Sequence, residues 1–259
     1  MLEPAQIALL AGAGLLAGAV NAVAGGGSLI SFPTLLAVGY PALTANVTNA
    51  VALTPGYFGG TLGYRRELEG QRRRILALGA TSAAGAVIGA FLLVVSSAEF
   101  FERVVPFLIF LACGLLAAQT RLARLVRERR VAPAGDPPET DPHTVPLFTA
   151  QFLAAIYGAY FGAGVGIMML AILGIFLADN LQRLNALKGL LSLLINGIAA
   201  VYFVLFADVR WVAVAIMAVT SLLGGQLGVV LARRLNDQAL RWLVIAFGVA
   251  VGLRLLVAS

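Results

Sequence analysis

Long apolar segments, separated by short polar stretches, follow one another along the whole chain. They lie at approximately residues 5–24, 28–39, 43–63, 74–95, 101–120, 146–163, 166–178, 184–206, 210–231 and 239–257. Most are long enough for a helix to cross a hydrocarbon core about 30 Å thick. Segments 28–39 and 166–178 are too short to cross it, because an α-helix rises only about 1.5 Å per residue. The pattern predicts an all-α integral membrane protein.

Each of the two short segments directly follows a glycine-rich break within apolar sequence. The breaks read Ala-Gly-Gly-Gly-Ser at residues 24–28 and Gly-Ala-Gly-Val-Gly at residues 162–166. Glycine destabilises a helix interior by roughly 0.5–1 kcal/mol relative to alanine, so we expect the helices to end there. In a bilayer, irregular backbone is tolerated only where it is buried in protein or lines a cavity. Matching breaks in two halves of a chain are typical of a transporter's substrate site.

Arginine placement indicates which loops are cytoplasmic. Loops 64–74, 121–145 and 232–241 hold most of the arginines. Cytoplasmic loops carry an excess of Lys and Arg, so we expect all three on the cytoplasmic side of the membrane. Segment 43–63 then runs inward and segment 184–206 runs outward, which makes the two halves of the chain antiparallel.

Antiparallel halves need an odd number of crossings in each half. Three full spans plus one re-entrant pair satisfy this, with residues 5–39 entering from the outer side and residues 146–178 from the inner side. We therefore predict two inverted-topology repeats, each with a glycine-broken re-entrant or discontinuous helical pair plus three transmembrane helices. The two halves are not inverted if segments 28–39 and 166–178 cross the membrane fully. Loop 179–183 does not by itself indicate on which side of the membrane it lies. The predicted units are a first transmembrane repeat at 1–120, an Arg- and Pro-rich cytoplasmic linker at 121–145, and a second transmembrane repeat at 146–259.

Composition agrees with a membrane protein and excludes several other classes. Charged residues make up 12% of the chain, whereas a soluble domain carries roughly 25%. The net charge of +6 comes from the loop arginines and does not indicate a nucleic-acid partner. Cys113 is the only cysteine, so no intramolecular disulfide can form, and His143 lies in the linker without other metal-ligand residues in a recognisable pattern. The chain has no Walker-type phosphate loop, HExxH or CxxC motif, so we expect neither an enzyme nor a bound cofactor.

Segment 184–206 carries a polar face that includes Lys188, the only lysine of the chain. Asn185, Lys188, Ser192 and Asn196 recur at helical spacing and therefore lie on one side of the helix. An ionisable residue inside a membrane span is a candidate for an anion site. The alternatives are that Lys188 snorkels to the cytoplasmic interface and that the face is a helix–helix seam of small and polar residues. The corresponding face of the first half consists of Asn49, Ala52, Gly56 and Gly60.

The candidate substrate-binding residues lie in the breaks, next to them or on the polar face. They are Asn21, Gly25, Gly26, Gly27, Ser28, Asn46, Asn49, Gly164, Gly166, Gln182, Asn185, Lys188, Ser192 and Asn196. Asn46 and Asn49 have an alternative role as caps of a helix that starts near residue 47. Glycine breaks and helix starts both present backbone N–H groups, and the positive end of a helix dipole favours an anion. A small oxyanion is therefore the expected ligand.

These residues resemble the TauE/SafE sulfite exporter family, also described as the toluene sulfonate uptake permease family. In the first half the likeness covers Gly18–Ser28, Phe32–Pro33 and Asn46–Val51, and in the second half it covers Gly158–Gly166 and Asn185–Gly189. The resemblance extends over nearly the whole chain. It implies a multi-pass secondary transporter in the bacterial inner membrane. The expected cargo is sulfite or organosulfonates such as sulfoacetate, moved by alternating access.

The sequence leaves other functions and partners open. One alternative is a carrier of another small organic anion or of a neutral solute, and another is a non-transporting membrane assembly component. The expected partners are the lipid bilayer and a small anionic substrate. A coupling proton or ion and a homodimer are both compatible with the sequence.

Overall fold

The described part of the chain is entirely helical or connecting loop. The computed structural model describes residues 2–23, 25–128, 145–177, 179–231 and 237–258. These ranges contain no β-strand, which confirms the all-α prediction. The helices are α1 (Pro4–Val23), α2 (Ser28–Ala37), α3 (Ala42–Gly63), the 3-10 helix η1 (Arg65–Leu68), α4 (Arg72–Val95), α5 (Ala98–Glu128), α6 (Val145–Tyr160), α7 (Val165–Phe176), α8 (Leu181–Phe206), α9 (Trp211–Leu231) and α10 (Asp237–Ala258). Their bounds agree with the predicted apolar segments to within a few residues, except at the end of α5.

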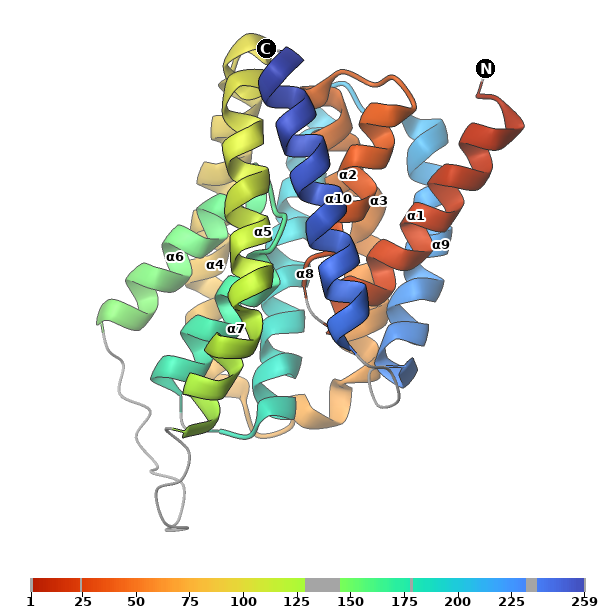
Figure 1. Ribbon diagram of the computed structural model, residues 1–259. Helices are drawn as coiled ribbons and strands as arrows, with labels where there is room; N and C mark the ends of the chain where they lie inside the picture. The colour runs from red at the N-terminus through yellow and green to blue at the C-terminus, as the bar shows by residue number, and fades with distance from the viewer. Residues whose placement is uncertain (1, 24, 129–144, 178, 232–236, 259) are drawn as a thin grey trace.

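The glycine breaks divide two pairs of helices. In Figure 1, α1 descends from the N-terminus toward the middle of the molecule, and α2 returns toward the same upper side. Helix α7 starts near mid-height and runs to the lower side, where α8 begins. With 10 and 12 residues, α2 and α7 are only about 15–18 Å long at 1.5 Å per residue. Both are therefore half-length helices whose N-termini lie inside the molecule.

The loop before α8 lies beside the arginine-rich loop that joins α3 to α4. The Asp179 carboxylate accepts hydrogen bonds from Arg74 at 2.5 Å and from Arg183 at 3.0 Å. Arg183 also donates to the Glu69 carbonyl oxygen at 2.9 Å. The sequence alone indicated no side for this loop. These contacts place it at the same end of the molecule as the α3–α4 connection.

Helices α3 and α8 lie against each other and run in opposite directions. At one end, Thr61 near the C-terminus of α3 lies beside Gly189 near the N-terminus of α8. At the other end, the Arg210 amide just after α8 donates to the Thr48 hydroxyl near the start of α3 at 3.1 Å. The two helices therefore form an antiparallel pair that reaches from one end of the molecule to the other.

The described helices are apolar enough to form a membrane bundle. Five of them are long and apolar enough to cross a bilayer, at Pro4–Ala22, Arg72–Val95, Ala98–Ala118, Leu181–Phe206 and Trp211–Gly228. Large apolar side chains are exposed on these helices, among them Phe91, Phe107, Val201 and Val219. Exposed apolar surface on this scale fits contact with lipid better than contact with water. The chain is therefore a multi-pass helical membrane protein.

Close contacts between helices depend on glycines in two helix pairs. Helix α9 packs on α1, where a Cβ on Gly228 would lie 2.6 Å from the Ala19 carbonyl oxygen. Helix α4 packs on α6, where a Cβ on Gly85 would lie 2.6 Å from the Phe152 carbonyl oxygen. Small residues let helix backbones approach this closely. The same kind of contact recurs one turn away in each pair, at Gly224 and Gly89.

The predicted capping role of Asn46 and Asn49 is wrong. Helix α3 begins at Ala42, with Pro41 at its N-cap, so both asparagines lie within the helix. Proline suits a helix start because its missing N–H would have no partner there, and Ala42 and Leu43, which follow it, are good helix formers. The apolar boundary near residue 43 therefore predicted the start better than the asparagines did.

Helix α5 continues to Glu128 rather than ending at residue 120. Residues 121–128 contain no Gly or Pro, and their apolar positions keep a helical spacing, so nothing in the sequence interrupts the helix. The arginines at the start of the predicted flexible linker therefore belong to a helix. The rest of the linker, including His143, lies outside the described residues.

Candidate substrate-binding site

The two glycine breaks meet inside the molecule. A Cβ on Gly25 would lie 2.6 Å from the Gly166 Cα, and a Cβ on Gly166 would lie 2.7 Å from the Gly25 Cα. Gly25 also has a φ of +83°, a left-handed conformation that only glycine adopts without strain. The backbones of the two breaks are therefore in direct contact, and neither position has room for a side chain.

The first break is held in shape by Asn21 at the end of α1. The Asn21 Oδ1 accepts a hydrogen bond from the Gly27 amide at 2.7 Å. A Cβ on Gly27 would lie 2.8 Å from the Asn21 Cγ, so this position also requires glycine. Within the described part of the chain, the amides of Gly26 and Ser28 have no backbone or side-chain acceptor. The start of α2 thus keeps N–H groups that a ligand could use.

The second break places two glycines in the left-handed region. Gly162 has a φ of +80° and Gly164, the N-cap residue of α7, has a φ of +76°. The Tyr157 hydroxyl donates to the Ala163 carbonyl oxygen at 2.6 Å and so ties the break to α6. Among the described residues, the Gly166 amide in the first turn of α7 has no acceptor. This break therefore also presents a free N–H group at a helix start.

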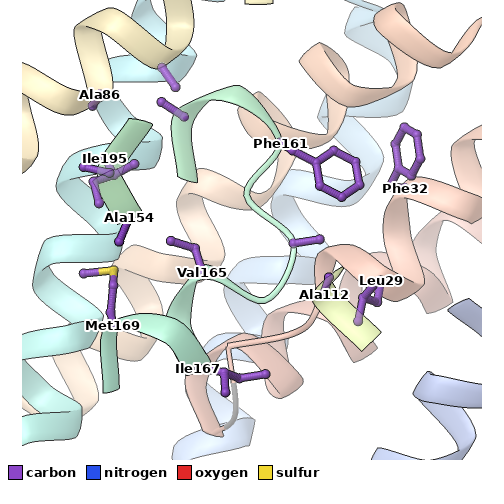
Figure 2. Close-up of a cluster of buried hydrophobic side chains, with 14 of the residues drawn as sticks. Leu29, Phe32, Ala86, Ala112, Ala154, Phe161, Val165, Ile167, Met169 and Ile195 are labelled. Atoms are coloured by element: carbon purple, nitrogen blue, oxygen red, sulfur yellow. The ribbon is translucent and has the colours of Figure 1, made fainter. Parts of the chain in front are cut away.

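Apolar side chains surround the second break on the side of α2 and α5. Figure 2 shows Phe161 beside Phe32, and their ring centroids are 5.4 Å apart in an edge-to-face arrangement. Ala112 of α5 lies close to Gly164, where a Cβ would be 3.3 Å away. An apolar surround with few polar groups is typical of small-molecule sites and strengthens electrostatic interactions inside them.

The polar face of α8 is buried and points at this region. Asn185, Lys188, Ser192 and Asn196 are all buried, which agrees with their predicted position on one side of the helix. The Ser192 hydroxyl points at the Met169 sulfur of α7 at 3.7 Å. Asn196 lies beside the second break, with its Oδ1 4.0 Å from the position of a Cβ on Gly162. The face therefore spans from the second break toward the N-terminal end of α8.

Lys188 does not snorkel to the interface. Its side chain is only 2% exposed, and its Nζ has no hydrogen-bond partner among the described residues. A snorkelling lysine would carry its ammonium to the surface and bury only its alkyl stem. This alternative is therefore wrong for the structure described here.

Asn49 and Asn185, which occupy equivalent positions after the two breaks, share an unusual property. Both are buried, and the Oδ1 of each lacks a hydrogen-bond donor within the described residues. Asn46 is bonded differently, because its Nδ2 donates to the Tyr160 carbonyl oxygen at the end of α6 at 2.9 Å. Gln182 is exposed near the Asp179 loop and stands apart from the buried set.

Two polar residues of α3 were missed by the sequence reasoning. Tyr57 is buried, and its hydroxyl lies near Ser28 after the first break and Asn196 on α8. The Thr61 hydroxyl is buried without a partner among the described residues. The sequence does show a hydroxyl group at each of these two positions, within an apolar segment rich in small residues. It does not show which helix each hydroxyl faces.

The groups of this region are mainly hydrogen-bond donors. They comprise one amine, several hydroxyls, side-chain amides and the N–H groups at two helix starts. No group of three or more His, Cys, Asp or Glu that could hold a metal ion occurs in the described ranges. The arrangement can bind and orient a small anion, but it contains no recognisable nucleophile–base pair.

Half-length helices that start at buried, touching glycine breaks within an apolar helical bundle define the class: a multi-pass membrane transporter with discontinuous helices. The chain belongs to the sulfite exporter TauE/SafE family, whose sequence model matches residues 10–255. Membership confirms the resemblance seen in the sequence and agrees with a transporter rather than an enzyme.

Curated relatives align over most of their length. A probable membrane transporter protein, ORF9, from Sinorhizobium sp is 26% identical over 250 residues, covering 96% of this chain and 92% of the relative. A probable membrane transporter protein from Haemophilus influenzae is 28% identical, covering 86% and 83%. The probable membrane transporter protein YfcA of Escherichia coli K12 is 24% identical, covering 100% and 93%. No solved structure matches the chain significantly.

Proposed function

We propose that the protein is a secondary carrier of small sulfur-containing anions, such as sulfite and organosulfonates including sulfoacetate. The carrier works by alternating access, and its substrate-binding site lies between the two halves of the chain. The observation that carries the proposal is Lys188, whose amine is buried without a partner among the described residues. Removing an ammonium from water costs several kcal/mol unless an opposite charge compensates it. A bound anion would provide that charge. The sulfur chemistry comes from the family name.

The packing supports two inverted repeats. If α1–α5 correspond to α6–α10, then α1 against α9 corresponds to α6 against α4, and both pairs are in contact. The glycine contacts of Gly228 with Ala19 and of Gly89 with Ile156 occupy matching places in these two pairs, because each is the second of two glycine contacts along its pair. Likewise α2 contacts α10 and α7 contacts α5. This exchange of partners is the arrangement expected of repeats related by a two-fold axis in the membrane plane.

The arginine loops support an orientation in a bacterial inner membrane. The loop at 64–74 and the Asp179 loop lie at one end of the molecule, and the positive-inside rule makes this the cytoplasmic end. The site residues then lie between the two ends, in reach of either side if one half moves against the other. The proposal leaves room for a coupling proton or ion and for a homodimer.

A neutral solute explains the site less well than an anion does. It would leave the Lys188 amine without a counter-charge, and it would not use the positive ends of α2 and α7. A non-transporting assembly component would have no need of irregular backbone at this depth. The buried lysine and the touching breaks therefore favour anion transport.

The test is a thermal-shift panel on the purified full-length protein with sulfite, sulfate, thiosulfate, sulfoacetate, isethionate, taurine and acetate. A ligand at one hundred times its dissociation constant stabilises the native state by roughly 2.7 kcal/mol. We expect stabilisation by sulfite or a sulfonate in the wild type and none in Lys188→Gln. Without ligand, Lys188→Gln should be at least as stable as wild type, because it removes a buried, unpaired amine. Equal ligand responses in both proteins would contradict the role of Lys188.

A further inference from the structure

Three buried polar atoms without partners cluster at the N-terminal end of α8. They are the Thr61 Oγ1, the Asn185 Oδ1 and the Lys188 Nζ, none of which has a hydrogen-bond partner among the described residues. The exposed fractions of the three side chains are 8%, 9% and 2%. A buried polar group without a partner costs free energy, and native proteins keep few of them. Thr61 and Lys188 can both donate hydrogen bonds, so they indicate a place at this end of α8 where a ligand with acceptor oxygens could bind.

Helix geometry brings these residues to one side of α8. Successive residues are about 100° apart around a helix axis, so on α8 the angular position of Asn185 lies between those of Lys188 and Gly189. Thr61 reaches this surface from α3, because its Oγ1 lies 3.6 Å from the position of a Cβ on Gly189. The absence of a side chain at Gly189 leaves the Thr61 hydroxyl open toward the polar face.

The charges of this region set the charge of the ligand. Lys188 is the only Lys, Arg, Asp or Glu side chain that is buried among the described residues. Arg74 and Arg183, at the cytoplasmic end, already share Asp179. The helix starts at the breaks add only partial charges, and the Gly27 amide is already bonded to Asn21. The site therefore supplies one full positive charge.

We infer that Thr61, Asn185 and Lys188 form one oxyanion-binding site that accepts a singly charged headgroup and discriminates against dianions. The inference rests on the proposed function and narrows its substrate class to monoanions, so that among organosulfonates a dianion such as sulfoacetate becomes a poor ligand. The ammonium of Lys188 neutralises one negative charge, and the hydroxyl of Thr61 donates a hydrogen bond to a headgroup oxygen. Asn185 orients the headgroup by donating from its Nδ2, because its Oδ1 can only accept a hydrogen bond. A second negative charge on the ligand would be buried without compensation, which is strongly unfavourable.

The test compares anions of one and two charges on the full-length protein by isothermal titration calorimetry. Isethionate and methanesulfonate carry one charge at neutral pH, whereas sulfate and sulfoacetate carry two. Ionic strength is held constant with gluconate. We expect isethionate to bind at least about tenfold more tightly than sulfoacetate. Thr61→Val, which removes only the hydroxyl, should weaken isethionate binding about tenfold, as expected for a hydrogen bond to a charged group. Thr61→Ser should retain it.

Thr81→Val is the matched control, because the Thr81 hydroxyl already donates to the Ala77 carbonyl oxygen within α4 at 3.1 Å. It should bind isethionate as wild type does. Tighter or equal binding of the dianions would overturn the inference while leaving anion transport intact. Unchanged binding in Thr61→Val would remove Thr61 from the site. If Thr61→Val does not fold, the inference is tested by isethionate binding to Thr61→Ser and by the ratio of monoanion to dianion affinity in the wild type. Failure of every anion to bind would instead contradict the proposed function itself.

Discussion

Gly25 and Gly166 join the two halves of the molecule through backbone contact. Each would place a Cβ within 2.7 Å of the other's Cα, and backbone cannot move aside as a flexible side chain can. Asn21 adds to this by bonding the Gly27 amide, so the first break has a defined shape before any ligand arrives. Preorganised N–H groups avoid the cost of ordering the site on binding.

Gly25→Ala should therefore destabilise the protein. The new Cβ would overlap Gly166, and alanine would be strained at a φ of +83°. We expect a loss of about 2 kcal/mol in the free energy of unfolding, seen as a lower melting temperature in detergent. Gly12→Ala is the control, since no atom lies within 4 Å of its Cβ position in α1. It should be neutral or slightly stabilising. Equal melting temperatures for the two variants would contradict the contact between the breaks.

The sequence predicted individual site residues only where the information is local. The breaks and the polar face from Asn185 to Asn196 follow from glycine content and helical spacing. The structure finds the described residues of both breaks and the four polar residues of this face buried. Tyr57 and Thr61 were missed because their importance depends on which helix lies opposite. Gln182 was included on its nearness to Asn185 in sequence, but it lies on the exposed side of the helix start.

At the scale of elements, apolar length predicted the helices well, because a membrane helix must satisfy its backbone internally and needs a continuous apolar run. The predictions failed mainly at the ends of helices. Helix α5 extends into arginine-rich sequence because charged residues at the end of a helix do not stop it. The partners of each helix could not be predicted, since glycine contacts such as Gly228 with Ala19 depend on shape complementarity between distant segments.

If the two halves are equivalent repeats, equivalent glycine contacts should have equal importance. Gly228→Ala and Gly89→Ala would each place a Cβ within 2.6 Å of a carbonyl oxygen of the facing helix. We expect both to destabilise by a similar amount, about 2 kcal/mol, measured by thermal unfolding in detergent. Gly197→Ala in α8 is the control, because its Cβ would meet no atom within 4 Å. A large effect in one variant and none in the other would argue against equivalent packing.

At the scale of the whole molecule, the Asp179 loop ties the second half to the first at the arginine-rich end. Burial raises the pKa of Asp179, but hydrogen bonds from Arg183, the Asn180 amide and Arg74 outweigh it and lower the pKa below the ordinary value of 3.8. A carboxyl whose pKa is lower in the folded state stabilises it at neutral pH. That contribution is lost as the pH falls through the folded pKa.

Asp179→Asn should consequently lower the melting temperature at neutral pH, and the difference from wild type should shrink on acidification below pH 3.8. The measurement is a series of melting curves of both proteins across this range. Asp208→Asn is the control, because its ion pair with Arg210 is largely exposed, with the Asp208 side chain 64% accessible. A pH-independent difference between wild type and Asp179→Asn would show that the carboxylate charge does not tie the loops together.

The most direct test of anion transport is uptake of labelled sulfite and isethionate into liposomes that contain only the purified full-length protein. We expect saturable uptake that excess unlabelled anion suppresses and that Lys188→Gln abolishes. Uptake no greater than in protein-free liposomes, or equal uptake by wild type and Lys188→Gln, would contradict this expectation.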